Sequence, residues 1–194
     1  NIHLSLFEKT QKEERISMKR LLPGMQTSQE RIKQMIRVNQ AGEYGALRIY
    51  QGQLDVLKNH PSSSLIQIMK DQEQEHLETF NQLLTERKIK PTFFTPLWHL
   101  GGYALGALTA KLGVKAAMAC TVAVEEVIDQ HYATQVEELE KKNLEPELSI
   151  TIKRFREDEI SHKDQSLEAG AADAPGFTVL RHSIKTITRV AIWL

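Results

Sequence analysis

The sequence has a single cysteine in 194 residues, so an intrachain disulfide cannot stabilise the fold. It also has no excess of charge, because 25 Lys and Arg balance 25 Asp and Glu. A chain without a basic field lacks the electrostatic signature of a nucleic-acid-binding protein. Alternating apolar and polar runs, the signal of β-strands, are nearly absent. These absences favour a neutral helical protein held together by an ordinary hydrophobic core.

Capping and breaking signals predict helices along most of the chain. Thr27-x-x-Glu30 has the form of a capping box, and Pro91 disfavours helical geometry in the residue before it. The predicted helices cover about 28–58, 62–90, 114–142, 146–170 and 175–194. We therefore predict an all-α fold in which residues 26–194 form one domain. Its parts are two pseudo-repeats at about 28–90 and 114–170, an apolar segment at 91–113 and a terminal helix at 175–194, while the role of residues 1–25 stays open.

One pattern of acids and histidines occurs twice. Each copy has a lone glutamate and, further on, a Glu-x-x-His: Glu43, Glu73 and His76 in the first copy, and Glu125, Glu159 and His162 in the second. Each lone glutamate is followed after seven residues by a tyrosine and after ten by a glutamine: Tyr50 and Gln53, then Tyr132 and Gln135. Residues three or seven apart share a helix face, so each copy directs its members to one side.

These glutamates occupy positions at which a helix would bury a hydrophobic side chain. Glu43, for example, falls on the same stripe as Leu47 and Leu54. Most acids on helices face water, and solvated surface acids are the alternative interpretation. Four buried carboxylates need counter-charge, which two divalent cations supply. Helical bundles that hold two iron or manganese ions use this same set of four glutamates and two histidines. We therefore predict that the six residues bind two metal ions.

Several runs resemble the demethoxyubiquinone hydroxylase family of ubiquinone biosynthesis. They are Arg-Val-Asn-Gln-Ala-Gly-Glu-Tyr-Gly-Ala at 37–46, Asp-Gln-Glu-Gln-Glu-His at 71–76, Ala-Cys-Thr-Val-Ala-Val-Glu-Glu at 119–126, Phe-Arg-Glu-Asp-Glu at 155–159 and Arg-Val-Ala-Ile at 189–192. The resemblance covers roughly residues 31–194. One small departure is Asn39, which stands where the family commonly has an aspartate.

The resemblance implies a ferritin-like four-helix bundle with a di-iron centre, in which Glu73 and Glu159 bridge two Fe ions. It implies a monooxygenase that hydroxylates the ring of demethoxyubiquinol, a polyprenylated quinol, with O2. The reductant is expected to come from outside, with NADH-derived electrons passing through the quinol as one route. Other implied partners are membrane lipid, a lipid-presenting helper protein and a second copy of the chain in a homo-oligomer. The expected location is peripheral: the matrix face of the mitochondrial inner membrane in a eukaryote, or the cytoplasmic face of the cell membrane in a bacterium.

Other polar residues lie close to these motifs in the sequence. Tyr132 and His131 are candidates to orient substrate or relay protons. Tyr50 and Tyr132 are more simply explained as hydrogen-bond donors, each to the glutamate two turns before it on the same helix, Glu43 and Glu125 respectively. Asp158 is placed to fix the outer ring nitrogen of a ligating histidine. The histidines without a partner in the repeat are not expected to bind metal: His60, His99 and His182.

Twenty consecutive residues, 91–110, contain no charged side chain. Prolines and glycines interrupt this segment, so we expect it to lie at a membrane interface or to form a buried crossover between helix pairs, rather than to span a bilayer. Near the end of the chain an apolar stripe is flanked by Arg181, Lys185 and Arg189. Basic amphipathic helices favour anionic lipid, but an ordinary packed terminal helix has the same pattern.

Two other functions are compatible with the motif. A ferritin-like ferroxidase or a peroxide-scavenging di-iron protein would use nearly the same ligands. A non-catalytic, membrane-associated helical scaffold would keep the bundle and bind no metal. The uncharged segment 91–110 favours the hydroxylase, because a soluble iron-handling protein has no need of an apolar entrance for a lipid.

Overall fold

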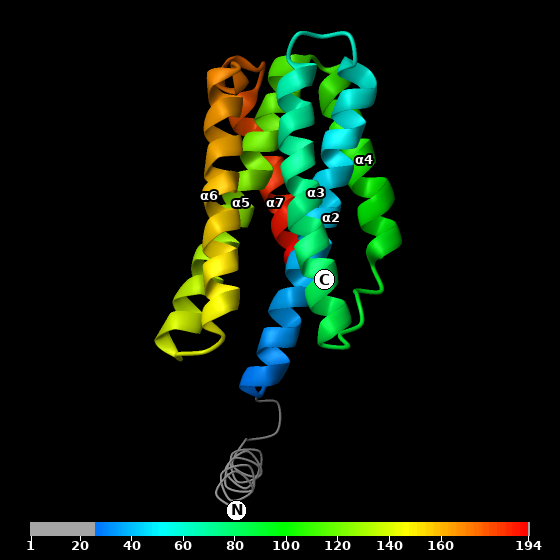
Figure 1. The fold of residues 1–194 in the computed structure, drawn as a ribbon. Helices are drawn as coiled ribbons and strands as arrows, with labels where there is room; N and C mark the ends of the chain where they lie inside the picture. Colours follow the sequence, from blue (N-terminus) through cyan, green and yellow to red (C-terminus); the bar gives the residue numbers. More distant parts are fainter. Residues whose placement is uncertain (1–25, 194) are drawn as a thin grey trace, which may run out of the picture. The chain divides into compact units, whose positions relative to one another are not determined.

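The computed structural model describes residues 26–193, and among these residues it contains helices and no strands. The elements are α2 (Ser28–Leu57), α3 (Ser63–Glu86), α4 (Thr95–Lys111), α5 (Val114–Lys141), α6 (Pro146–Glu168), a short 3-10 helix η1 (Ala171–Asp173) and α7 (Phe177–Trp193) (Figure 1). The predicted all-α fold is confirmed. The N-terminal segment 1–25 lies outside the described residues.

The capping box at the start of α2 forms as predicted. The backbone N–H of Glu30 donates to Thr27 Oγ1 at 3.1 Å, and the backbone N–H of Thr27 donates to Glu30 Oε2 at 2.9 Å. Two donors at the start of the helix are satisfied in this way. From Arg37 onward the chain forms one compact unit, which contains every residue of the doubled motif.

Within this unit α3, α5, α6 and the part of α2 from Arg37 onward form a helical bundle (Figure 1). The amide of Gln40 on α2 donates to Asn81 Oδ1 on α3 at 3.0 Å, and Arg156 on α6 donates to Asp129 Oδ1 on α5 at 2.6 Å. Between α2 and α5, the Asn39 and Gln135 amides exchange two hydrogen bonds of 2.8 Å. The two halves of the repeat therefore face each other across the bundle, as in ferritin-like proteins.

Helix α3 ends earlier than we predicted. The expected end was near Lys90, but the last helical residue is Glu86. Lys88 adopts the left-handed conformation with φ 52°, and the backbone N–H of Ile89 donates to the carbonyl of Leu84 at 2.8 Å. This turn buries Ile89, which is 7% exposed, so core packing ends the helix before Pro91 is reached.

The uncharged segment contains helix α4 despite its prolines and glycines. A Cβ on Gly52 of α2 would collide with the carbonyl oxygen of Tyr103, and one on Gly106 of α4 would collide with that of Ile49. The two helices therefore touch backbone to backbone, and glycine is needed at these crossings. This contact supports the buried-crossover interpretation for the inner face of α4.

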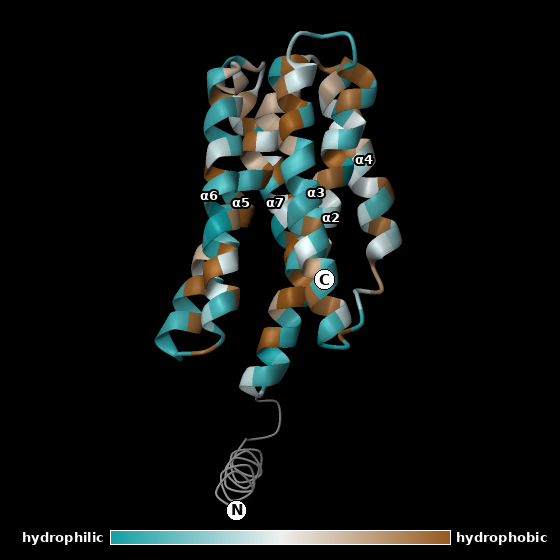
Figure 2. Ribbon diagram, viewed as in Figure 1, coloured by the Kyte–Doolittle hydropathy of each residue, from teal (hydrophilic) through white to brown (hydrophobic). Residues whose placement is uncertain are grey.

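The outer face of α4 is apolar and exposed. Leu97, Leu100 and Leu108 are 51%, 70% and 61% exposed, and Phe93 just before the helix is 93% exposed. Figure 2 shows apolar residues over much of this helix. Among residues 26–193, no helix has the length and apolar content needed to cross a membrane.

Helix α7 packs on α5 through its basic face. Lys185 donates to Glu126 Oε2 at 2.9 Å and Arg181 Nε donates to the same oxygen at 2.8 Å, while Arg189 donates to Gln130 at 3.3 Å. These cations, which we had considered for contact with anionic lipid, have partners inside the protein. The finding favours a packed terminal helix.

Candidate metal centre

The six residues of the doubled motif converge in the interior of the bundle. Each of the six side chains is at most 2% exposed. Helix α2 supplies Glu43, α3 supplies Glu73 and His76, α5 supplies Glu125, and α6 supplies Glu159 and His162. Because each helix turns its motif face inward, residues up to 119 positions apart in the sequence meet at one place.

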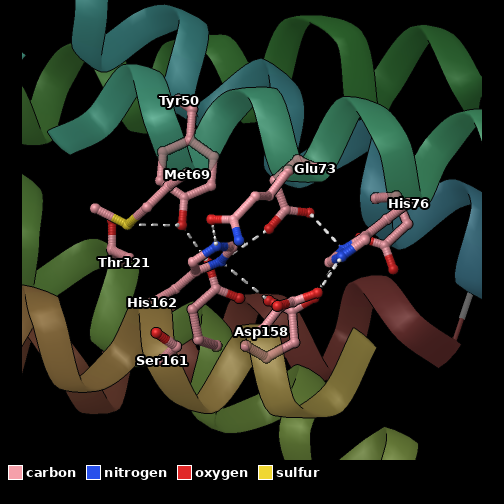
Figure 3. A network of polar contacts seen from close by, with 12 residues as sticks. Tyr50, Met69, Glu73, His76, Thr121, Asp158, Ser161 and His162 are labelled. Atoms are coloured by element: carbon pink, nitrogen blue, oxygen red, sulfur yellow. Dashed lines mark hydrogen bonds and ion pairs between the residues drawn. The ribbon is translucent and has the colours of Figure 1, made fainter. Parts of the chain in front are cut away.

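The cluster divides into two overlapping groups of four. The His76 group contains Glu43, Glu73, His76 and Glu159, and the His162 group contains Glu73, Glu125, Glu159 and His162. Within each group the candidate ligand atoms lie within 4.8 Å of one another. Glu73 and Glu159 belong to both groups, which is the arrangement expected of bridging carboxylates. In Figure 3, Glu73 lies between the rings of His76 and His162.

The polar atoms that face the centre lack hydrogen-bond partners among the described residues. They include both carboxylate oxygens of Glu73 and Glu159, one oxygen each of Glu43 and Glu125, and Nδ1 of both histidines. Such buried polar atoms are costly when they have no partner. All eight are atoms that coordinate divalent cations, so the site has the donor set of a two-metal centre.

Crowding of the carboxylates changes their acidity. Burial and the neighbouring Glu73 carboxylate raise the pKa of Glu43 well above its ordinary value. Burial also raises the pKa of Glu125, with Glu159 and Glu73 adding to the rise. Both shifts have the same physical cause, which is that negative charges are held close together in a dry interior. A cation in the cluster would remove this repulsion.

The histidines respond in the opposite sense. Burial alone would lower the pKa of His76, but the Glu159 and Glu43 carboxylates, 3.4 and 3.8 Å from its Nδ1, outweigh burial and raise the pKa to about 12. The same balance, with Glu159 and Glu73 as partners, raises the pKa of His162 to about 9. Glu159 is buried, which would raise its pKa, yet both histidines hold it at about 2. Protons and metal ions therefore compete for the same atoms.

Two buried tyrosines bind the lone glutamates in a crossed arrangement. The hydroxyl of Tyr50 on α2 donates to Glu125 Oε1 on α5 at 2.7 Å, and the hydroxyl of Tyr132 on α5 donates to Glu43 Oε1 on α2. We had expected each tyrosine to contact the glutamate two turns away on its own helix. The structure corrects this: each tyrosine reaches across to the other half, because residues on facing helices lie closer than residues two turns apart along one helix.

The outer ring nitrogens of the two histidines are held by different side chains. His76 Nε2 lies 3.1 Å from Asp158 Oδ2, as in Figure 3, and His162 Nε2 lies 3.0 Å from Gln72 Oε1. Asp158 therefore contacts the histidine of the opposite half. Gln72 was missed by the sequence analysis, although it directly precedes Glu73 just as Asp158 precedes Glu159.

His131 lies outside both groups of candidate ligands. Its Nε2 is 2.7 Å from Gln135 Nε2 and 3.2 Å from Asn39 Oδ1, beside the amide pair that joins α2 and α5. The other histidines without a repeat partner are elsewhere too. For example, His99 contacts the hydroxyl of Tyr44 at 2.6 Å, and His60 Nδ1 accepts from the backbone of Ser62 at 3.1 Å.

The fold and the site define a helical bundle with a buried carboxylate–histidine cluster compatible with a metal centre, the class to which ferritin-like proteins belong. Comparison with known families shows which family of this class the chain belongs to. The model of the family described as "Ubiquinone biosynthesis protein COQ7" matches residues 30–194, and the chain belongs to this family.

Named relatives agree with this assignment. A 3-demethoxyubiquinol 3-hydroxylase of Rhodospirillum rubrum is 47% identical over 174 residues, covering 89% of this chain and 81% of the relative. A mitochondrial NADPH-dependent 3-demethoxyubiquinone 3-hydroxylase of Bos taurus is 45% identical over 185 residues, covering 93% and 85%. A mitochondrial 5-demethoxyubiquinone hydroxylase of Saccharomyces cerevisiae is 43% identical over 178 residues, covering 84% and 76%.

Proposed function

We propose that this protein is a di-iron monooxygenase that hydroxylates the ring of demethoxyubiquinol with O2 in ubiquinone biosynthesis. The observation that carries the proposal is the buried cluster of eight unpartnered ligand atoms in a chain of this family. The proposed iron ligands are Glu43, Glu73, His76, Glu125, Glu159 and His162, with Glu73 and Glu159 as bridges.

The donor set suits iron. Six glutamate oxygens and two imidazole nitrogens form an oxygen-rich field with one nitrogen for each ion, which iron and manganese accept more readily than a site built of thiolates. When bound, two ferrous ions would supply the electrons that activate O2 for attack on an electron-rich ring. Four carboxylates and two divalent cations also balance in charge, which the buried site requires.

The surrounding residues would position the ligands and exclude water. Tyr50 and Tyr132 each hold one oxygen of a lone glutamate, which leaves the second oxygen directed to the centre. We propose that Tyr132 and the adjacent His131 also orient the quinol ring or move a proton from its hydroxyl. His131 is part-buried, and its ring centroid lies 6.2 Å from that of Tyr132, which donates to Glu43.

The exposed apolar surface of α4 supports the proposed substrate and location. A polyprenylated quinol resides in a membrane, and the exposed leucines of α4 offer an apolar face for contact with lipid. We propose peripheral attachment through this face: at the mitochondrial inner membrane in a eukaryote, where the related hydroxylases are named mitochondrial, or at the cell membrane in a bacterium. A lipid-presenting helper protein or a second copy of the chain is proposed to use the same face.

The reductant is proposed to be a nicotinamide nucleotide that acts through the quinol. Several eukaryotic relatives are named NADPH-dependent, which supports an electron source of this class. Here the quinol would be both substrate and electron carrier.

Turnover by the purified full chain tests the proposal. The protein is loaded with ferrous iron and given a short-tailed demethoxyquinol, O2 and a reductant, and the hydroxylated product is quantified by mass spectrometry with labelled oxygen. The account predicts two irons per chain and one labelled oxygen atom in the product. Oxygen consumption without ring hydroxylation would instead identify a ferroxidase, and a chain that binds no iron would identify a scaffold. Glu137→Gln on the exposed face of α5 is the control for Glu125→Gln, which should abolish turnover.

A further inference from the structure

The two groups of candidate ligands are surrounded by matching residues. Both contain the bridging glutamates, and each adds one lone glutamate and one histidine. In the His76 group, Glu43 accepts from Tyr132, and in the His162 group, Glu125 accepts from Tyr50. In these contacts the two halves of the repeat are interchangeable, so they give no reason for one metal position to differ from the other.

The residues behind the histidines break this equivalence. The partner of His76 is the Asp158 carboxylate at 3.1 Å, and the partner of His162 is the Gln72 amide oxygen at 3.0 Å. The two residues occupy the same place in the repeat, directly before a bridging glutamate, and each contacts the histidine of the opposite half. The two contacts thus have the same geometry, but the group next to the His76 ring is a charged carboxylate and the group next to the His162 ring is a neutral amide.

This difference acts on the metal-facing nitrogen. A carboxylate that accepts the ring N–H draws the proton toward itself and increases the electron density at Nδ1, whereas an amide carbonyl does so more weakly. Removing such an outer partner typically changes metal affinity about 10- to 100-fold. Both Nδ1 atoms are directed at the same pair of bridging glutamates, and His76 Nδ1 also lies 3.8 Å from Glu43 Oε2. With a carboxylate behind its ring, His76 Nδ1 is the stronger donor of the two.

We propose that the two metal positions are chemically distinct, and that the ion in the His76 group is bound more tightly and occupied first because Asp158, and not an amide, supports its histidine. This inference rests on the proposed function of the cluster as a two-metal site. It assigns to Asp158 and Gln72 the role of positioning residues that set the order of loading. The ion in the His162 group is then the more readily exchanged of the two.

Isosteric substitutions separate charge from shape. Asp158→Asn puts an amide behind both histidines, and Gln72→Glu puts a carboxylate behind both. The full-length metal-free chain is titrated with Co²⁺ alone, by calorimetry and visible absorption. The expected wild-type result is two binding steps. Asp158→Asn should weaken the tighter step about 10- to 100-fold, and Gln72→Glu should strengthen the weaker step.

Single-position variants assign each step. In a His162→Ala background the remaining Co²⁺ binds in the His76 group, and adding Asp158→Asn should weaken Co²⁺ binding by the same factor. In a His76→Ala background, adding Asp158→Asn should leave the affinity for Co²⁺ unchanged. Equal effects in both backgrounds, or none in either, overturn the inference. If either background fails to fold, Mössbauer spectra of the diferrous proteins decide: two distinct doublets in the wild type should converge in Asp158→Asn, and a single doublet in the wild type refutes the inference. A wild-type chain that binds no Co²⁺ and no iron refutes the proposed function instead.

Discussion

Replacing one buried carboxylate of the cluster should make the metal-free protein more stable and the metal-loaded protein less so. The clearest position is Glu125, which is 1% exposed and whose pKa is raised by burial and by the Glu159 and Glu73 carboxylates. Glu125→Gln removes the charge and keeps an oxygen that can accept from Tyr50. Exchanging a buried ion for a neutral group of the same size is often stabilising by about 1 to 4 kcal/mol.

The magnitude expected here lies in the lower half of that range, because the Glu125→Gln variant would still bury a polar amide. We predict that the metal-free variant is about 1 to 2 kcal/mol more stable, which raises Tm by roughly 2–8 °C for a chain of this size. With saturating metal the wild type should be the more stable of the two. A metal ion present at about 1,000 times its Kd stabilises the wild type by about 4 kcal/mol, and the variant binds metal less tightly because it has lost one coordinating carboxylate. Thermal unfolding with and without chelator measures both effects.

The pH dependence of the metal-free wild type has a definite sign. Glu125 and the two histidines have folded-state pKa values above their ordinary values, so the folded protein holds more protons than the unfolded chain. Stability should therefore fall as the pH rises from about 5 to 9, and Glu125→Gln should reduce the slope. The reasoning is refuted if the metal-free variant is less stable than Glu137→Gln, the exposed control on the same helix, or if stability rises over this pH range.

Three further predictions concern the packing around the cluster. Gly106→Ala should lower the free energy of unfolding by about 1 to 3 kcal/mol, because the new Cβ meets the α2 backbone. Gly101→Ala is the control, because Gly101 has open space around it, and this variant should be neutral or slightly stabilising in denaturant titrations. Glu126→Gln should cost about 1 to 3 kcal/mol, since Lys185 is 15% exposed and would lose its carboxylate; equal midpoints for variant and wild type would contradict this. Tyr50→Phe should weaken one Co²⁺-binding step about tenfold with little change in secondary structure by circular dichroism; unchanged binding would show that the hydroxyl does not hold the ligand.

The sequence was sufficient to predict which residues meet at the centre. Glutamates such as Glu43 and Glu125 stand at helix positions that must face the core, so periodicity alone places them inside. The all-α fold and the family followed from the same motifs and are confirmed. The crossed contacts of Tyr50 and Tyr132 were not predictable in this way, because a helical period gives the direction of a side chain but not the facing residue that it reaches.

Local sequence signals did not predict the end of α3 or the formation of helix α4 correctly. Pro91 marks the limit beyond which α3 cannot continue, but burial of Ile89 ended the helix sooner. The glycines of the uncharged segment were treated as helix breakers, whereas Gly106 serves the close contact between α4 and α2. In both cases tertiary packing decided the outcome over local propensity.

The most direct test of the central claim is a crystal structure of the iron-loaded full chain with anomalous diffraction recorded at the iron edge. The account predicts two anomalous peaks inside the bundle, both within bonding distance of Glu73 and Glu159, one next to His76 and the other next to His162. One peak, no peak, or iron bound at the protein surface would contradict it.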